Sequence, residues 1–148
     1  KAGVNVALGT DGVASNNSHD LFEEIKLAAL LHKGIGLDPA AVTARQALEM
    51  ATINGARALR RNTGVIAPGK TADLILVDLA APNLFPCHDV EADLVYSARG
   101  SNVVMNMARG RVIYEKGEFF TLDLEKIRAE VEGYALPRIF GSVRGGGA

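Results

Sequence analysis

The fold is decided by a short stretch near the start of the chain, Val4-Asn5-Val6-Ala7-Leu8-Gly9-Thr10-Asp11-Gly12. Its apolar run is too brief for a globular helix, and near-continuous apolarity predicts a strand buried on both faces of a parallel sheet. Asp11 follows this strand directly, between glycines that allow a tight turn. In α/β folds, ligands and catalytic groups gather at this end of parallel strands. Asp11 is therefore either a functional carboxylate or the cap of the next helix.

The residues around and after Asp11 carry a family pattern. It consists of Leu8-Gly9-Thr10-Asp11-Gly12, Ser15-Asn16-Asn17, Leu21-Phe22-Glu23-Glu24 and Leu27-Ala28-Ala29-Leu30-Leu31. This text resembles the metal-dependent amidohydrolase superfamily, most closely its deaminases acting on 5-methylthioadenosine and S-adenosylhomocysteine. The resemblance implies that Asp11 ends the eighth barrel strand, binds a divalent metal (Zn²⁺ or Fe²⁺) and carries a proton in catalysis. It also implies that Ser15 and Asn16 bind the substrate.

The length of the chain limits how much of that fold it can form. The chain has 148 residues and begins with Lys1, whereas a complete (β/α)₈ barrel needs on the order of 250 residues. We therefore expect an α/β fragment, namely the C-terminal end of an amidohydrolase barrel plus part of a small β-sandwich domain. The expected segments are the last barrel strand with its loop and following helices (1–62), the β-sandwich segment (63–122), and a C-terminal helix with a flexible tail (123–148).

The amino-acid composition argues against some classes of binding partner and favours one cellular compartment. Sixteen Lys and Arg residues balance 17 Asp and Glu residues, which argues against a nucleic-acid or anionic-membrane partner. Cys87 is the single cysteine, so an intrachain disulfide is excluded and a reducing cytoplasm is favoured. No apolar run approaches the roughly 20 residues of a membrane span. We expect a cytoplasmic protein, and the family resemblance implies a small nucleoside as its substrate.

Local signals predict one long helix after the Asp11 loop. Ser18 or Asp20 can serve as its N-cap, and the helix should run to about Lys33. Gly34 and Gly36 are expected to stop it. Its apolar stripe contains Phe22, Ile25 and Ala29, with Leu27 and Leu31 beside it.

Similar signals predict the elements that follow. Thr43-x-x-Gln46 is a capping box at the start of a helix that ends near Thr52. A short helix is expected over 53–59, and a helix over 124–131 is expected to be ended by Pro137. A strand at 65–66 should be joined by a type II turn at Pro68-Gly69 to a buried strand over 74–77. Residues 103–107 and 111–114 should form a hairpin. Residues 91–96 are compatible with either helix or strand.

The sequence lacks most of the catalytic set that the resemblance implies. That set includes a His-x-His pair, two further histidines and a proton-donating Glu. The chain contains no His-x-His, and His19, His32 and His88 match none of the expected positions. It therefore carries one member, Asp11, and we expect the chain alone to be inactive and to bind metal weakly.

Two classes of function stay open. The first is the C-terminal part of a deaminase, acting on 5-methylthioadenosine or S-adenosylhomocysteine, or on another ring substrate such as 5′-deoxyadenosine, guanine or a triazine. The second is a stand-alone, non-catalytic domain for binding or assembly. For the isolated chain, the unpaired edges of the strand at 4–8 predict either self-association or poor order of residues near 1–33 while the 64–120 region stays folded. We also expect the protein to be a homo-oligomer.

Overall fold

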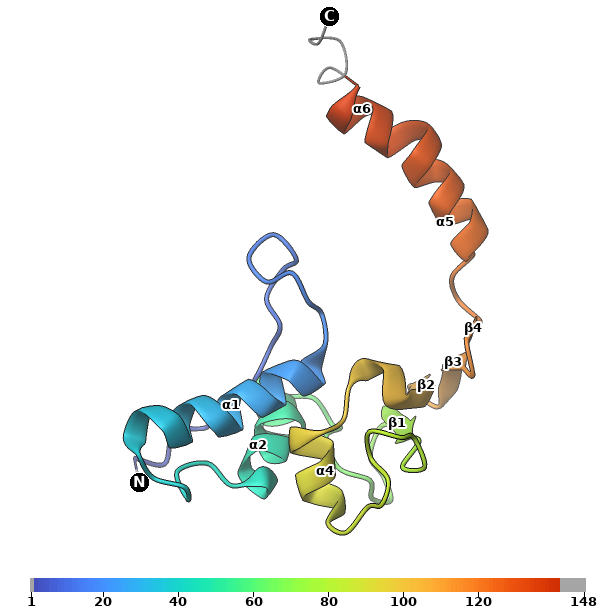
Figure 1. The fold of residues 1–148 in the computed structure, drawn as a ribbon. Helices are drawn as coiled ribbons and strands as arrows, with labels where there is room; N and C mark the ends of the chain where they lie inside the picture. Colours follow the sequence, from blue (N-terminus) through green and yellow to red (C-terminus); the bar gives the residue numbers. More distant parts are fainter. Residues whose placement is uncertain (1, 142–148) are drawn as a thin grey trace, which may run out of the picture.

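The computed structural model describes residues 2–141 and shows a mixed α/β chain (Figure 1). The helices of the first half are α1 (Leu21–Gly36), α2 (Ala44–Ala51) and α3 (Ile53–Ala58). They are followed by strand β1 (Leu74–Val77), helix α4 (Val90–Tyr96), the 3-10 turn η1 (Gly100–Asn102), and strands β2 (Val103–Ala108), β3 (Arg111–Glu115) and β4 (Glu118–Phe119). The chain ends with α5 (Leu124–Glu130), the π-helical turn η2 (Val131–Ala135) and α6 (Leu136–Phe140).

The strands form one antiparallel sheet in the order β1-β2-β3-β4. Leu74 pairs with Met107 between β1 and β2, and Met105 pairs with Glu115 between β2 and β3. The two-residue turn Arg109-Gly110 joins β2 to β3, and both residues have positive φ, as a type I′ turn requires. The predicted hairpin and the predicted strand over 74–77 are confirmed, but the expected burial of that strand is wrong, because Ile75 and Leu76 are exposed.

The main hydrophobic core lies between α1, α2 and α4 rather than against the sheet. The predicted stripe of α1 is buried there, together with side chains from α2, from α4 and from the connections next to them. The members of the cluster are Phe22, Ile25, Ala29, Val42, Ala47, Leu84, Val95 and Ala98. The neighbouring side chains Leu27, Leu31 and Ile35 stay exposed, Ile35 by 82%, so α1 has an uncovered apolar face. Self-association through such a face stays a prediction.

The strand predicted at Val4–Leu8 is not formed. The segment is irregular, and Val4 and Val6 are 74% and 47% exposed, so burial on both faces is also wrong. A strand exists only through a hydrogen-bonded partner, and none of the described residues pairs with this segment as a strand. It is held instead by Leu8 N donating to Met50 O at 3.0 Å and by Asn54 Nδ2 donating to Val6 O at 2.9 Å.

Three smaller expectations are also wrong. Gly34 and Gly36 do not stop α1, because glycine weakens a helix without ending it; the helix ends where Leu37 turns left-handed at φ 48°. Val65 and Ile66 form no strand, and Ile66 is 89% exposed. Pro137 does not end the last helix, because it lies in the first turn of α6, where its missing N–H is not needed.

Hydrogen bonds at helix N-termini show where α4 and α2 begin. Residues 91–96 belong to the helix α4, whose N-cap Asp89 accepts a hydrogen bond from Ala92 N at 3.1 Å. The capping box of α2 is present, with Gln46 N donating to Thr43 Oγ1 at 3.2 Å.

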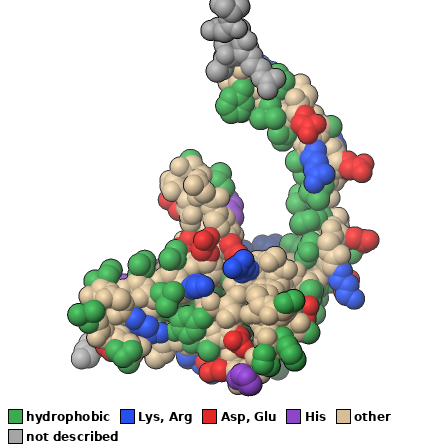
Figure 2. Space-filling view, viewed as in Figure 1, with side chains coloured by type: hydrophobic (Ala, Val, Ile, Leu, Met, Phe, Trp, Pro, Cys, Tyr) green, Lys and Arg blue, Asp and Glu red, His purple; other side chains and the backbone are tan. Residues whose placement is uncertain are grey.

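The last helical run, from α5 to α6, stands away from the rest of the molecule (Figures 1 and 2). The flexible tail predicted after it lies, from residue 142 onward, outside the described residues. Within residues 2–141, no helix is both long enough and apolar enough to cross a membrane.

Gly64 is the position where the fold tolerates a side chain least. Its φ is +88°, and a Cβ there would lie 2.9 Å from both Ala56 Cβ and Ile53 Cα. Gly69 has a similar φ of +79°, yet nothing lies within 4 Å of its Cβ position. It occupies the predicted Pro68-Gly69 turn, which Lys70 N closes by donating to Ala67 O at 3.2 Å.

These two glycines form a matched pair for measuring packing at the α3 contact. Both alanine substitutions pay for the left-handed backbone, roughly 1–2 kcal/mol. Gly64→Ala should lose about 1–3 kcal/mol more, because the new methyl group overpacks against α3. Urea unfolding of both variants measures this difference, and equal losses would show that Gly64 does not pack against α3 as described.

Candidate functional site

Asp11 lies on a loop that rises from the body of the molecule just before α1 (Figures 1 and 2). Its backbone is left-handed, with φ 57°, a conformation that costs free energy for most residues but is tolerated by Asp and Asn. Its Oδ1 accepts a hydrogen bond from the next amide, Gly12 N, at 2.7 Å. The side chain is exposed, and Oδ2 has no hydrogen-bond partner among residues 2–141.

The structure decides between the two interpretations of Asp11 as a helix cap or a free carboxylate. The N-cap of α1 is Asp20, whose Oδ1 accepts from Phe22 N at 3.0 Å. The second oxygen of Asp20, Oδ2, accepts from Gly100 N at 2.8 Å. Asp11 therefore caps no helix, and no other described group engages its carboxylate besides the adjacent amide.

The two predicted substrate-binding residues behave differently in the same loop. Ser15 and Asn16 both donate their backbone N–H to Gly12 O at 2.9 Å, which folds the loop back after Asp11. The Asn16 side chain is engaged at both ends: Nδ2 donates to Glu24 Oε1 at 2.6 Å, and Oδ1 accepts from Ser18 N at 3.3 Å. Ser15 is exposed, and its hydroxyl bonds to none of the described residues. Substrate binding by either residue stays a prediction.

Glu24 helps to position the Asp11 loop, a role that the sequence analysis did not predict. It lies in the first turn of α1 and holds the Asn16 amide, so it fixes the end of the loop that carries Asp11. The available signal was the acidic pair in the first turn, but acidic residues are common there because they suit the helix dipole.

The described residues do not assemble a metal centre. No group of three or more His, Cys, Asp and Glu side chains within residues 2–141 is arranged to hold a metal ion. A zinc site takes three or four protein ligands, and the loop offers Asp11 alone. Within residues 2–141 the structure therefore gathers no set of ligands around Asp11, and no reaction step through a metal is derived from it.

Cys87, His88 and Asp89 lie together in sequence but do not form a catalytic group. Asp89 uses its carboxylate to cap α4. The Asp93 carboxylate raises the pKa of the Cys87 thiol, first as its hydrogen-bond acceptor and also by its charge. A nucleophilic cysteine needs the opposite shift, because the thiolate is the reactive form.

Comparison with known proteins shows which family shares this loop. The family described as the Amidohydrolase family matches residues 1–113. The 5-methylthioadenosine/S-adenosylhomocysteine deaminase of Moorella thermoacetica is 55% identical over 132 residues, covering 88% of this chain and 31% of that protein. The 5′-deoxyadenosine deaminase of Methanosarcina acetivorans is 54% identical over 128 residues, covering 86% of this chain and 30% of that protein.

Solved structures agree with the sequence comparison. An adenosine deaminase from Xanthomonas campestris with bound zinc matches with a TM-score of 0.85 and 38% identity, over 89% of this chain and 30% of that one. A zinc-bound atrazine chlorohydrolase from Arthrobacter aurescens matches with a TM-score of 0.81 and 30% identity, over the same shares. The chain thus spans about 30% of the length of the relatives it matches. These matches confirm the resemblance seen in the sequence: the chain belongs to the amidohydrolase family.

Proposed function

We propose that this chain is the C-terminal part of a metal-dependent deaminase that releases ammonia from the purine ring of an adenosine-type nucleoside. The proposal is supported by relatives whose sequences are about 50% identical to this chain. They are named 5-methylthioadenosine/S-adenosylhomocysteine deaminase or 5′-deoxyadenosine deaminase. In that arrangement residues 4–8, which form no strand within residues 2–141, would lie beside strands from the preceding part of the enzyme. The expected division at residues 62 and 122 belongs to the same proposal.

One observation carries the chemical part of the proposal, namely that the exposed carboxylate of Asp11 has no partner within residues 2–141 beyond the next amide. Hydrolytic deamination needs a base for the attacking water and a proton for the leaving amine. A carboxylate with one unengaged oxygen can take the first proton and deliver it onward.

We assign the proton transfer to Asp11 Oδ2, because Gly12 N holds Oδ1 at 2.7 Å and so fixes the orientation of the carboxylate. The same carboxylate would supply one ligand to a Zn²⁺ or Fe²⁺ ion in the full-length enzyme. A bound divalent ion lowers the pKa of a coordinated water toward neutrality. The other ligands and the proton donor for the ring lie outside this chain.

The substrate choice rests on the relatives rather than on this chain. The two deaminase names differ by one percentage point of identity, 55% against 54%, which does not separate their substrates. The triazine alternative is less supported, because the atrazine chlorohydrolase is only 30% identical. Ammonia release from 5-methylthioadenosine, S-adenosylhomocysteine and 5′-deoxyadenosine by the full-length enzyme tests the proposal, and no release from any of the three would favour the non-catalytic alternative.

Asp11→Asn should abolish most of the activity of the full-length enzyme without unfolding it. Asn tolerates the left-handed backbone and keeps an acceptor for Gly12 N, but it cannot take a proton. Removing a general base typically lowers kcat about 10²–10⁴-fold. Steady-state ammonia release, with metal content measured in parallel, gives the result.

Asp38→Asn is the matched control, because Asp38 is also exposed and accepts one hydrogen bond from a nearby backbone amide, Ala40 N at 2.9 Å. The control should keep normal kcat. Near-normal kcat in Asp11→Asn with full metal occupancy would remove Asp11 from the chemistry.

Ser15→Ala tests the substrate side of the loop. The exposed hydroxyl is free to bond the substrate, and a single neutral hydrogen bond contributes about 0.5–1.5 kcal/mol. KM should therefore rise roughly 2–10-fold with kcat little changed, measured by initial rates over a range of nucleoside concentrations. A fall in kcat at constant KM would place Ser15 among the reacting groups instead.

A further inference from the structure

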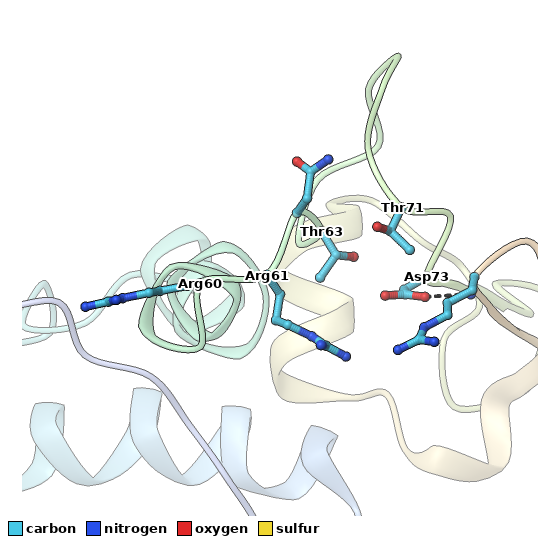
Figure 3. A pocket seen from close by; sticks show the side chains of 7 residues that line it. Arg60, Arg61, Thr63, Thr71 and Asp73 are labelled. Atoms are coloured by element: carbon cyan, nitrogen blue, oxygen red, sulfur yellow. Dashed lines mark hydrogen bonds between the residues drawn. The ribbon is translucent and has the colours of Figure 1, made fainter.

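A second polar cavity, separate from the Asp11 loop, is formed where three segments meet. It has a volume of about 230 Å³ and is lined by Arg61, Asn62, Thr63, Thr71, Asp73 and Arg109, with Arg60 at its edge. The segments are the link after α3, the start of β1 and the turn between β2 and β3. Figure 3 shows the side chains of Arg61, Thr63, Thr71 and Asp73 converging on one space, whereas Arg60 points away.

Hydrogen bonds between the three segments hold this cavity in shape. Asn62 Nδ2 donates to Gly69 O at 2.9 Å, and Thr71 N donates to Asn62 O at 2.8 Å. Arg109 N donates to Asp73 Oδ1 at 2.7 Å, and the next amide of that turn donates to Ala72 O at 2.9 Å. A rigid wall of this kind places the lining side chains before any ligand arrives.

The charges in the cavity are not balanced within the described part of the chain. Two guanidinium groups, Arg61 and Arg109, line it together with one carboxylate, Asp73. Neither arginine forms a salt bridge with residues 2–141, and Asp73 is engaged by a backbone amide rather than by a guanidinium. Two unpaired cations at one cavity repel each other, and a bound anion would remove that cost.

The two threonine hydroxyls in the cavity are hydrogen-bond donors without partners among residues 2–141. Thr63 and Thr71 are half-buried, and neither hydroxyl bonds to a residue within 2–141. Hydroxyls and guanidiniums together suit an anion with several oxygens, because arginine binds phosphate oxygens in pairs and each hydroxyl adds one further donor.

We propose that the cavity of Arg61, Arg109, Thr63 and Thr71 binds a phosphate group, either as free phosphate or as a phosphate monoester. This site is independent of the proposed deaminase activity, since none of its residues lies on the Asp11 loop. Asp73 sets a limit on its affinity, because its negative charge opposes the ligand.

The test is a titration of the 148-residue chain with sodium phosphate and, separately, with AMP at constant ionic strength. Amide chemical shifts of Thr63 and Thr71 report binding. Saturable shifts are expected with at least one ligand, and the tighter of the two identifies the source of the phosphate group. Arg61→Gln and Arg109→Gln should each weaken binding about tenfold or more, since a charge-assisted hydrogen bond is lost.

Two further variants test whether phosphate binds in this cavity or is attracted by positive charge anywhere on the surface. Arg57→Gln removes an exposed arginine of α3 that does not line the cavity and should leave binding unchanged. Asp73→Asn keeps the acceptor for Arg109 N and removes the opposing charge, so binding should tighten. Unchanged or weaker binding in Asp73→Asn would count against a phosphate group in this cavity.

Chemical modification gives an answer even if an arginine variant does not fold. Phosphate should protect Arg61 and Arg109 of the unmodified sequence from phenylglyoxal and leave Arg57 reactive. The proposal is overturned by absent saturable shifts with both ligands, by an equal loss in Arg57→Gln, or by no selective protection.

Discussion

The carboxylate of Asp20 makes the connection on which the rest of the arrangement depends. One of its oxygens starts α1 by accepting from Phe22 N, and the other accepts from Gly100 N, eighty residues away along the chain. A side chain at Gly100 would crowd this carboxylate, because a Cβ there would lie 3.3 Å from Asp20 Oδ2. The start of the main helix is thereby fixed to the turn that leads into the sheet.

A difference between two aspartates explains why the Asp11 carboxylate keeps one oxygen without a partner among residues 2–141. Asp20 satisfies the free amide at the start of the helix, and Glu24 on the same helix holds Asn16 and with it the end of the loop. Both contacts act beyond Asp11, so the loop keeps its shape without using the Asp11 side chain. The proposed role requires a carboxylate that is held in place and keeps an oxygen for the reacting atoms. Gly12 N donates to Oδ1 of Asp11, and Oδ2 has no partner within residues 2–141.

Sequence predicted the elements whose signals are local. The Thr43 and Gln46 capping box, the turn at Pro68-Gly69 and the β2–β3 hairpin each depend on residues a few positions apart, and all are present. The strand at Val4–Leu8 failed because a strand needs a partner, and its own residues cannot supply one. The Pro137 expectation failed because a proline in the first turn of a helix is tolerated.

The two candidate sites also differ in whether their residues lie close together in the sequence. Asp11 was found from sequence because one loop carries the whole pattern, although its freedom from helix capping needed the structure. The cavity proposed to bind phosphate joins residues nearly fifty positions apart, Arg61 and Arg109, through contacts that neither hydrophobic periodicity nor motif spacing indicates. Pairing of β1 with β2 brings the Arg109 turn to Asp73, and only the structure shows that pairing.

The most direct test of this account is the free energy of unfolding of two aspartate variants of the 148-residue chain in urea. Asp20→Ala removes a helix cap and the bond to Gly100, so it should lose about 2 kcal/mol. Asp11→Asn alters an exposed side chain whose only described partner is the adjacent amide, so it should change stability by less than about 0.5 kcal/mol. A loss in Asp11→Asn as large as that in Asp20→Ala would contradict the account, because Asp11 would then be a structural residue.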